Sequence, residues 1–189
     1  MANQDSPFGL RAIGKIGQNR DNQGLAEFSI AASATAIYGQ DPVKALATGT
    51  IGVAAAGDTL LGSLNGVFFT AADTSKPTFA NHLNASNTAT DIVGFVSSDP
   101  YERFEIQSDN TTASAQTDVF MNYDITYAAG SSHDYLSGVE LDDSTTSTAS
   151  GQLRVVGVSK DIKNNDLGAS HVNFVVMINE HFLKGTAGV

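Results

Sequence analysis

The sequence contains no cysteine and no tryptophan, and only 4 of its 189 residues are proline. The absence of cysteine excludes disulfide bonds, thiolate metal sites and cysteine nucleophiles. Charged residues are also scarce, at 16% against a usual value of about 25%. No apolar run approaches the roughly 20 residues of a membrane-spanning helix, and the first nine residues lack the apolar core of a signal peptide. We therefore expect a soluble protein made in the cytoplasm, with no membrane partner.

Basic residues are half as common as acidic ones. The 10 lysines and arginines stand against 20 aspartates and glutamates, which gives a net charge of −10. The basic residues are scattered along the chain, whereas a protein that neutralises nucleic-acid phosphates needs a clustered basic surface. We therefore expect no nucleic-acid partner, and the negative charge favours solubility.

No catalytic or cofactor motif stands out. The chain has no Gly-x-Ser-x-Gly sequence, and the glycines of residues 49–57 lack the lysine and hydroxyl residue of a phosphate-binding loop. The four histidines lack the spacing of a zinc-binding helix, so we interpret them as surface or strand-end residues. A cation bound at Glu140, Asp142 and Asp143 is an alternative to the favoured solvated turn, and a hydrolase using Glu140 and Asp142 is the least favoured hypothesis. We expect no enzyme activity and no cofactor.

What the sequence does contain is a series of short β-branched and aromatic runs, each closed by Gly, Asp or Pro. The pattern predicts an all-β fold, a mostly antiparallel barrel or sandwich with long loops and little helix. The predicted strands are 27–30, 43–46, 51–53, 67–70, 92–97, 102–107, 119–127, 136–141, 153–158 and 172–179. The polar segments 71–90 and 142–150 are predicted to be loops.

Three parts are expected along the chain. They are an extended N-terminal arm at 1–24, a β-rich domain at 25–183 with two lobes of related build at 25–107 and 117–183, and a C-terminal tail at 184–189. The arm has isolated apolar residues but no regular period. We expect Phe8 and Leu10 to dock on a partner, since both would otherwise be exposed, and a disordered N-terminus is the alternative.

The last two predicted strands are apolar on both faces. In 172–179, one face carries valine, phenylalanine and isoleucine, and the other carries Val175 and Met177 between asparagines. Strands of this kind are usually central and covered on both sides, or covered by another subunit. We therefore predict a subunit interface at Val175, Met177, His181 and Phe182, and a simple strand-end cap is the alternative for the last two.

An ordered set of short motifs runs along nearly the whole chain. These are SPFGLR (6–11), DPVK (41–44), AGD (56–58), FEIQ (104–107), SGVELD (137–142), LRVVGV (153–158), NDLG (165–168) and INEH (178–181). On these motifs the sequence resembles a family of tailed-bacteriophage head proteins, the capsid decoration or cement proteins. It departs from the pattern at Leu10 and Arg11, where many relatives have an aromatic residue after the glycine.

The resemblance implies a non-enzymatic virion protein on the capsid exterior, with the major capsid protein as its partner and no cofactor. The favoured hypothesis is a decoration protein that bridges capsid subunits, as a homotrimer that leaves no exposed sheet edges. A tail or head-fibre subunit that binds glycans is the alternative. Its sugar site would use the aromatic residues Phe68, Phe69, Tyr101, Tyr123, Tyr127 and Tyr135.

Overall fold

The computed structural model describes residues 3–16, 24–109, 112–185 and 188–189. Within these ranges the chain forms two six-stranded sheets and two short 3-10 helices, η1 (Gln116–Asp118) and η2 (Phe182–Lys184). Every paired strand in the two sheets is antiparallel, and neither sheet closes into a barrel over the described residues. The predicted all-β, mainly antiparallel fold with little helix is confirmed, as open sheets rather than a barrel.

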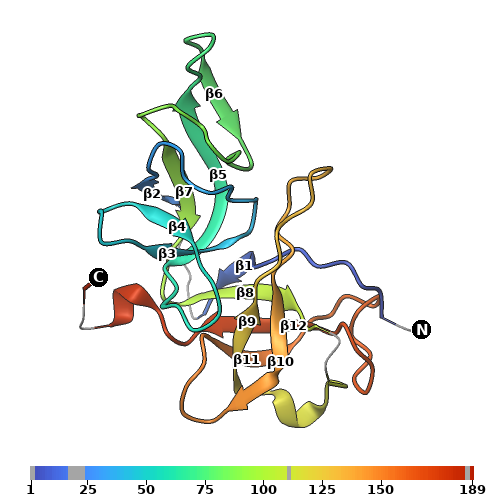
Figure 1. Ribbon diagram of the computed structural model, residues 1–189. Coiled ribbons are helices and arrows are strands. Elements are labelled where there is room, and N and C mark those ends of the chain that lie inside the picture. Colours follow the sequence, from blue (N-terminus) through green and yellow to red (C-terminus); the bar gives the residue numbers. More distant parts are fainter. Residues whose placement is uncertain (1–2, 17–23, 110–111, 186–187) are drawn as a thin grey trace.

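The lower lobe in Figure 1 is built on one of these sheets. Its strands follow the order β1 (Arg11–Lys15), β8 (Glu102–Gln107), β12 (Asn173–Ile178), β11 (Leu153–Val158), β9 (Asn122–Thr126) and β10 (Glu140–Ser147). Alternate residues of the central strands face one core, which contains Phe104, Phe174 and Val155. The predicted final pair of strands is therefore real and central to its sheet.

The upper lobe is built on the other sheet (Figure 1). Its order is β2 (Ala26–Ser29), β7 (Val93–Ser97), β5 (Gly62–Thr70), β3 (Pro42–Ala45) and β4 (Ile51–Val53). The sixth strand, β6 (Pro77–Ala80), pairs with the second half of β5, beyond the residues that pair with β3. Leu64 and Val67 of β5 and Val96 of β7 point into a second core. The alternate residues of these strands form the outer face of the sheet.

The structure corrects four predictions made from the sequence. Residues 11–15 of the predicted arm are β1, an edge strand whose bulge between Ala12 and Gly14 breaks the alternation that would have revealed it. The lobe boundary predicted at residue 107 is wrong, because β8 belongs to the lower sheet. The predicted loops 71–90 and 142–150 contain β6, a four-residue strand within a polar segment, and most of β10, an edge strand rich in aspartate, serine and threonine. Residues 1–2 and 17–23 of the arm and 186–187 of the tail lie outside the described residues.

Where the two lobes meet, side chains from each lobe pack into the core of the other. Ala54 and Leu60 lie between strands of the upper lobe in the sequence, but their side chains belong to the core of the lower lobe. Phe182, which follows the last strand of the lower lobe, packs against the core of the upper lobe. The buried Gln152 side chain donates to the carbonyl oxygens of Ala55 and Asp58, at 2.9 and 2.7 Å. Shared cores and buried hydrogen bonds hold the lobes in one arrangement.

Residue 9 must be glycine for the N-terminal segment to enter this junction. Gly9 has φ 74°, and a Cβ atom there would lie 2.4 Å from the carbonyl oxygen of Gln40. The next residue, Leu10, donates its N–H to that same oxygen at 2.9 Å, and its own carbonyl accepts from Ser63 Oγ at 2.6 Å. The segment before β1 is thus anchored in the protein's own core.

Candidate functional site

The N-terminal segment lies along the lower lobe and is held there by side-chain amides. Asn164 Nδ2 donates to the carbonyl oxygens of both Gln4 and His171, each at 2.7 Å. Gln107 Nε2 donates to the Gln4 carbonyl at 3.0 Å, and Gln107 Oε1 accepts from the N–H of Ser6 at 2.8 Å. Both amide side chains belong to buried residues. The segment around residue 5 and the loop before β12 are therefore fixed to each other.

A second set of hydrogen bonds holds the residue at the start of this segment. Asn3 Nδ2 donates to the carbonyl oxygen of Ser170 at 2.8 Å, and the N–H of Asp166 donates to Asn3 Oδ1 at 3.2 Å. Hydrogen bonds therefore hold the residues on both sides of Asp5 in the sequence. Its position is set although its own side chain is exposed.

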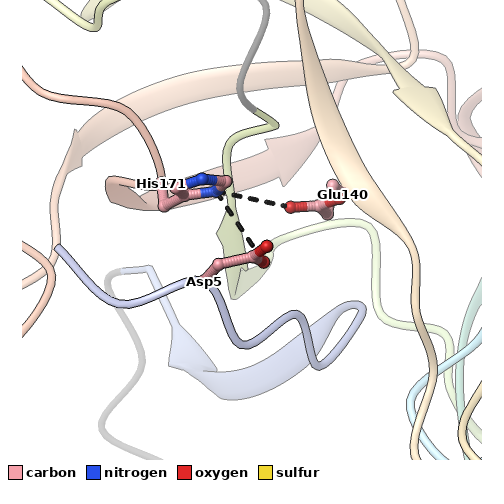
Figure 2. A group of neighbouring side chains, drawn as sticks. All are labelled: Asp5, Glu140 and His171. Carbon is pink, nitrogen blue, oxygen red and sulfur yellow. Dashed lines mark ion pairs between the residues drawn. The ribbon is translucent and has the colours of Figure 1, made fainter.

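Asp5, Glu140 and His171 meet beside this anchored segment, and Figure 2 shows their side chains converging. His171 Nδ1 lies 3.8 Å from Asp5 Oδ1 and 4.0 Å from Glu140 Oε1. The exposed fractions of the side chains are 17% for His171, 18% for Glu140 and 66% for Asp5. Glu140 begins β10, whereas His171 sits just before β12 with a φ of 59°, a left-handed conformation that is uncommon outside glycine. We call these three residues the carboxylate–histidine cluster.

The surroundings of this cluster are electrically negative. Burial and, after it, the nearby carboxylates of Asp5, Asp109 and Asp143 together raise the pKa of Glu140 to about 7. A carboxylate in such a place is stabilised by a proton or by a cation. Within the described ranges, this is the one group of three or more His, Cys, Asp or Glu side chains whose ligand atoms lie within 4.8 Å of one another.

A second candidate site is a set of aromatic rings on the outer face of the upper sheet, with Phe79 exposed and Phe68 and Phe95 half-buried. Phe68 on β5 pairs with Phe79 on β6 with ring centroids 4.7 Å apart, and Phe79 stacks on Phe95 of β7 at 6.4 Å. Phe79 is 73% exposed. We call these three residues the aromatic patch. Contiguous exposed aromatic side chains are typical of surfaces that bind other proteins.

The six predicted interface residues do not form one surface. Phe8, Val175 and Met177 are half-buried on the lower lobe, and the Arg11 guanidinium lies 4.4 Å from the centre of the Phe8 ring. Arg11 in turn pairs with Glu105, which is directly opposite Val175 in the sheet. These residues therefore share the outer face of the lower sheet, and their role as a subunit contact stays a prediction.

The other predicted interface residues lie at the junction of the lobes. Leu10 and His181 are 0% and 3% exposed, which corrects the prediction for both, because neither side chain is available at the surface. His181 caps η2, where its Nδ1 accepts from the N–H of Leu183 at 3.0 Å. Phe182 packs against the upper core. His181 is thus the N-cap of a 3-10 helix that follows β12, which is neither the predicted subunit contact nor a strand-end cap.

Sequence reasoning missed the carboxylate–histidine cluster as a group. It placed Glu140 with Asp142 and Asp143, but the Asp142 carboxylate instead accepts from the N–H and Oγ of Ser144, at 3.0 and 2.6 Å. Asp5 and His171 are far from Glu140 in the sequence, and no spacing rule connects them. The aromatic patch was missed because Phe79 is an isolated aromatic residue in a polar segment.

Comparison with known proteins gives no match for this chain, whether against family models, curated proteins or solved structures. In the part of the chain that the structure describes, no helix combines the length and apolar character of a membrane span. What supports a function for this protein is therefore its own residues and their geometry.

Proposed function

We propose that this chain is a non-enzymatic structural protein of a tailed-bacteriophage head. It binds the outer surface of the capsid and stabilises the shell by bridging neighbouring capsid subunits. The aromatic patch is the observation that carries the proposal, because Phe79 is 73% exposed on top of two half-buried rings, as in surfaces that bind other proteins. The resemblance of the sequence motifs to those of decoration proteins favours the major capsid protein as the partner.

The energetics of the aromatic patch suit a repeated contact on a shell. Burying a phenylalanine side chain contributes roughly 1.5–3 kcal/mol. A contact of this size is modest for one copy, but every bound copy favours the assembled shell by mass action. Many copies on one particle therefore stabilise it strongly.

The fixed arrangement of the two lobes supports bridging. A connector between capsid subunits loses less conformational entropy on binding when its two ends are already held relative to each other. In this chain the exchanged core residues and the Gln152 hydrogen bonds hold the lobes. A net charge of −10 also suits a protein outside the DNA compartment.

We also propose self-association as a homotrimer. The strands at the sheet edges are β1 and β10 in the lower sheet and β2, β4 and β6 in the upper sheet, with β10 and β4 each joined to another part of the chain by one isolated bridge. Open edges present unpaired backbone groups, and a closed cyclic oligomer can cover them without leaving a new edge. Light scattering on the purified protein tests this directly, and a monomer at all concentrations contradicts it.

The proposed location is tested on purified virions. We expect mass spectrometry to find this chain in near-stoichiometric ratio to the major capsid protein, and cryo-electron microscopy to show it as an even coat on the outer shell. Absence from mature particles would overturn the proposal.

A tail or head-fibre subunit that binds glycans remains the second candidate. The observation that favours it is the stacked pair of His82 and Tyr135, whose ring centroids are 3.8 Å apart with an interplanar angle of 6°. Flat exposed rings are suited to stacking on a sugar face. Tyr123, in contrast, is buried and cannot contribute. Labelled protein at one vertex or on the tail, instead of an even coat, would favour this candidate.

A further inference from the structure

We propose that Asp5, Glu140 and His171 bind one divalent transition-metal ion of the zinc or cobalt(II) class, and that this ion fastens the N-terminal segment to the lower lobe. The inference is independent of the proposed role on a phage capsid. It concerns the carboxylate–histidine cluster alone, and it holds for the free protein.

The donor atoms are arranged around a common point. His171 Nδ1 is 3.8 Å from Asp5 Oδ1 and 4.0 Å from Glu140 Oε1, and all three ligand atoms lie within 4.8 Å of one another. Tetrahedral zinc, with bonds of about 2.0–2.2 Å, places its donor atoms about 3.4 Å apart. The two distances to His171 therefore need to shorten by about 0.4 and 0.6 Å, and the distance between the two carboxylates by at most about 1.4 Å, to hold the ion. Asp5 is the ligand that can move most easily, because its side chain is 66% exposed.

Two of the donor atoms are buried but form no hydrogen bond. Glu140 Oε1 and His171 Nδ1 are both shielded from solvent, and neither has a hydrogen-bond partner in the described structure. Buried polar atoms are hydrogen-bonded in the great majority of cases, so each such atom calls for an explanation. The 4.0 Å between these two atoms is too long for a hydrogen bond. A metal ion between them satisfies both atoms at once.

The ligands are positioned before any ion binds. Asn164 holds the carbonyl oxygens of Gln4 and His171 with one side-chain amide, so the chain on which Asp5 lies is tied to the loop that carries His171. Glu140 is fixed by pairing with Thr126 in the sheet. Hydrogen bonds that fix the backbone on either side of metal ligands reduce the conformational entropy lost on binding.

The donor set selects the class of ion. One imidazole nitrogen and two carboxylates match zinc or cobalt(II), with a water molecule in the fourth position. Calcium and magnesium prefer shells made only of oxygen ligands, usually six or more. The carboxylates of Asp109 and Asp143, which act on Glu140 electrostatically, make the site more favourable for any cation.

The test is a titration of the full-length protein after treatment with a chelator and dialysis. Isothermal calorimetry with zinc is expected to show one ion per chain, and cobalt(II) is expected to give the absorption bands of a tetrahedral site. His171→Asn and Asp5→Asn are expected to weaken binding by about tenfold or more. Asp5→Asn is the safer variant, because an exposed residue of the N-terminal segment does not support the core. His133→Asn is the matched control, since His133 is exposed and outside the cluster.

A second readout follows the N-terminal segment itself. Hydrogen exchange at residues 3–8 is expected to slow when zinc is added to the unmodified protein and to the His133→Asn variant, but not in the His171→Asn variant. Failure to bind one ion per chain would overturn the proposal. So would equal binding by the unmodified protein and by Asp5→Asn and His171→Asn, because the ion would then be held elsewhere.

Discussion

The outer faces of the two sheets are built from different chemistry. On the lower sheet, Arg11 forms an ion pair with Glu105, and Arg154 donates to Asn122 Oδ1 at 3.0 Å and also to Asn179. On the upper sheet, the outer positions of β5, β6 and β7 carry the aromatic patch, in which Phe79 is 73% exposed and Phe68 and Phe95 are half-buried. Polar side-chain contacts hold the outer face of the lower sheet together, whereas the outer face of the upper sheet exposes an aromatic ring.

An apolar side chain on the outer face of a strand can be covered by neighbouring side chains of the same sheet. Met177 is paired with Arg154 on one side and with Arg103 on the other. Side chains directly opposite each other in a sheet lie close together, and the aliphatic stems of arginines can cover apolar neighbours. The half-buried state of Met177 therefore needs no second subunit. Alternation alone does not distinguish a covered face from a binding face.

The largest expected effect comes from the inner face of the lower sheet. Phe104 is fully buried in its core, and Phe104→Ala is expected to cost about 3–5 kcal/mol of unfolding free energy because it leaves a cavity. Urea denaturation measures this loss. A cost below about 1 kcal/mol would mean that the inner faces do not carry the stability of the fold.

Lower pH is expected to weaken the junction of the lobes. Burial lowers the pKa of His181 from 6.5 to about 4, and the charge of Lys184 acts in the same direction. The folded state thus holds this histidine neutral, so its contribution is fully present above pH 6.5 and is lost as pH falls toward 4. The loss is on the order of 3 kcal/mol. The difference in urea midpoint between the unmodified protein and His181→Gln, followed from pH 7 to 4, measures it, because the raised pKa values of Glu140 and Asp41 act in the opposite direction in both proteins.

A smaller effect is expected on the outer face of the lower sheet. Arg154→Ala removes the hydrogen bonds to Asn122 and Asn179 and the stem beside Met177, at a cost of about 1 kcal/mol. Arg154→Lys keeps the stem and one charge, and is expected to recover part of the loss. Thermal unfolding of the two variants distinguishes the contribution of the aliphatic stem from that of the guanidinium group. No change in either variant would show that the Arg154 contacts do not stabilise the outer face of the lower sheet.

Sequence reasoning predicted the elements whose pattern is local. The alternation of 102–107 and 153–158 identified β8 and β11, since buried strands repeat every two residues. It failed where partners are distant or the pattern is interrupted. The bulge in β1 hides its period, β10 continues through serines and threonines at a sheet edge, and the carboxylate–histidine cluster joins residue 5 to residues 140 and 171. Only the folded chain brings these together.

The measurement that tests the aromatic patch most directly is binding of Phe79→Ser to purified capsid shells that lack this protein. Phe120→Ser is the matched control, because Phe120 on the lower lobe is 75% exposed against 73% for Phe79. Both substitutions are at exposed positions, and urea denaturation checks that Phe79→Ser, which also loses its ring contacts with Phe68 and Phe95, stays folded. We predict that Phe79→Ser lowers shell binding about tenfold or more, while Phe120→Ser binds like the unmodified protein. Equal binding by all three proteins would contradict the account.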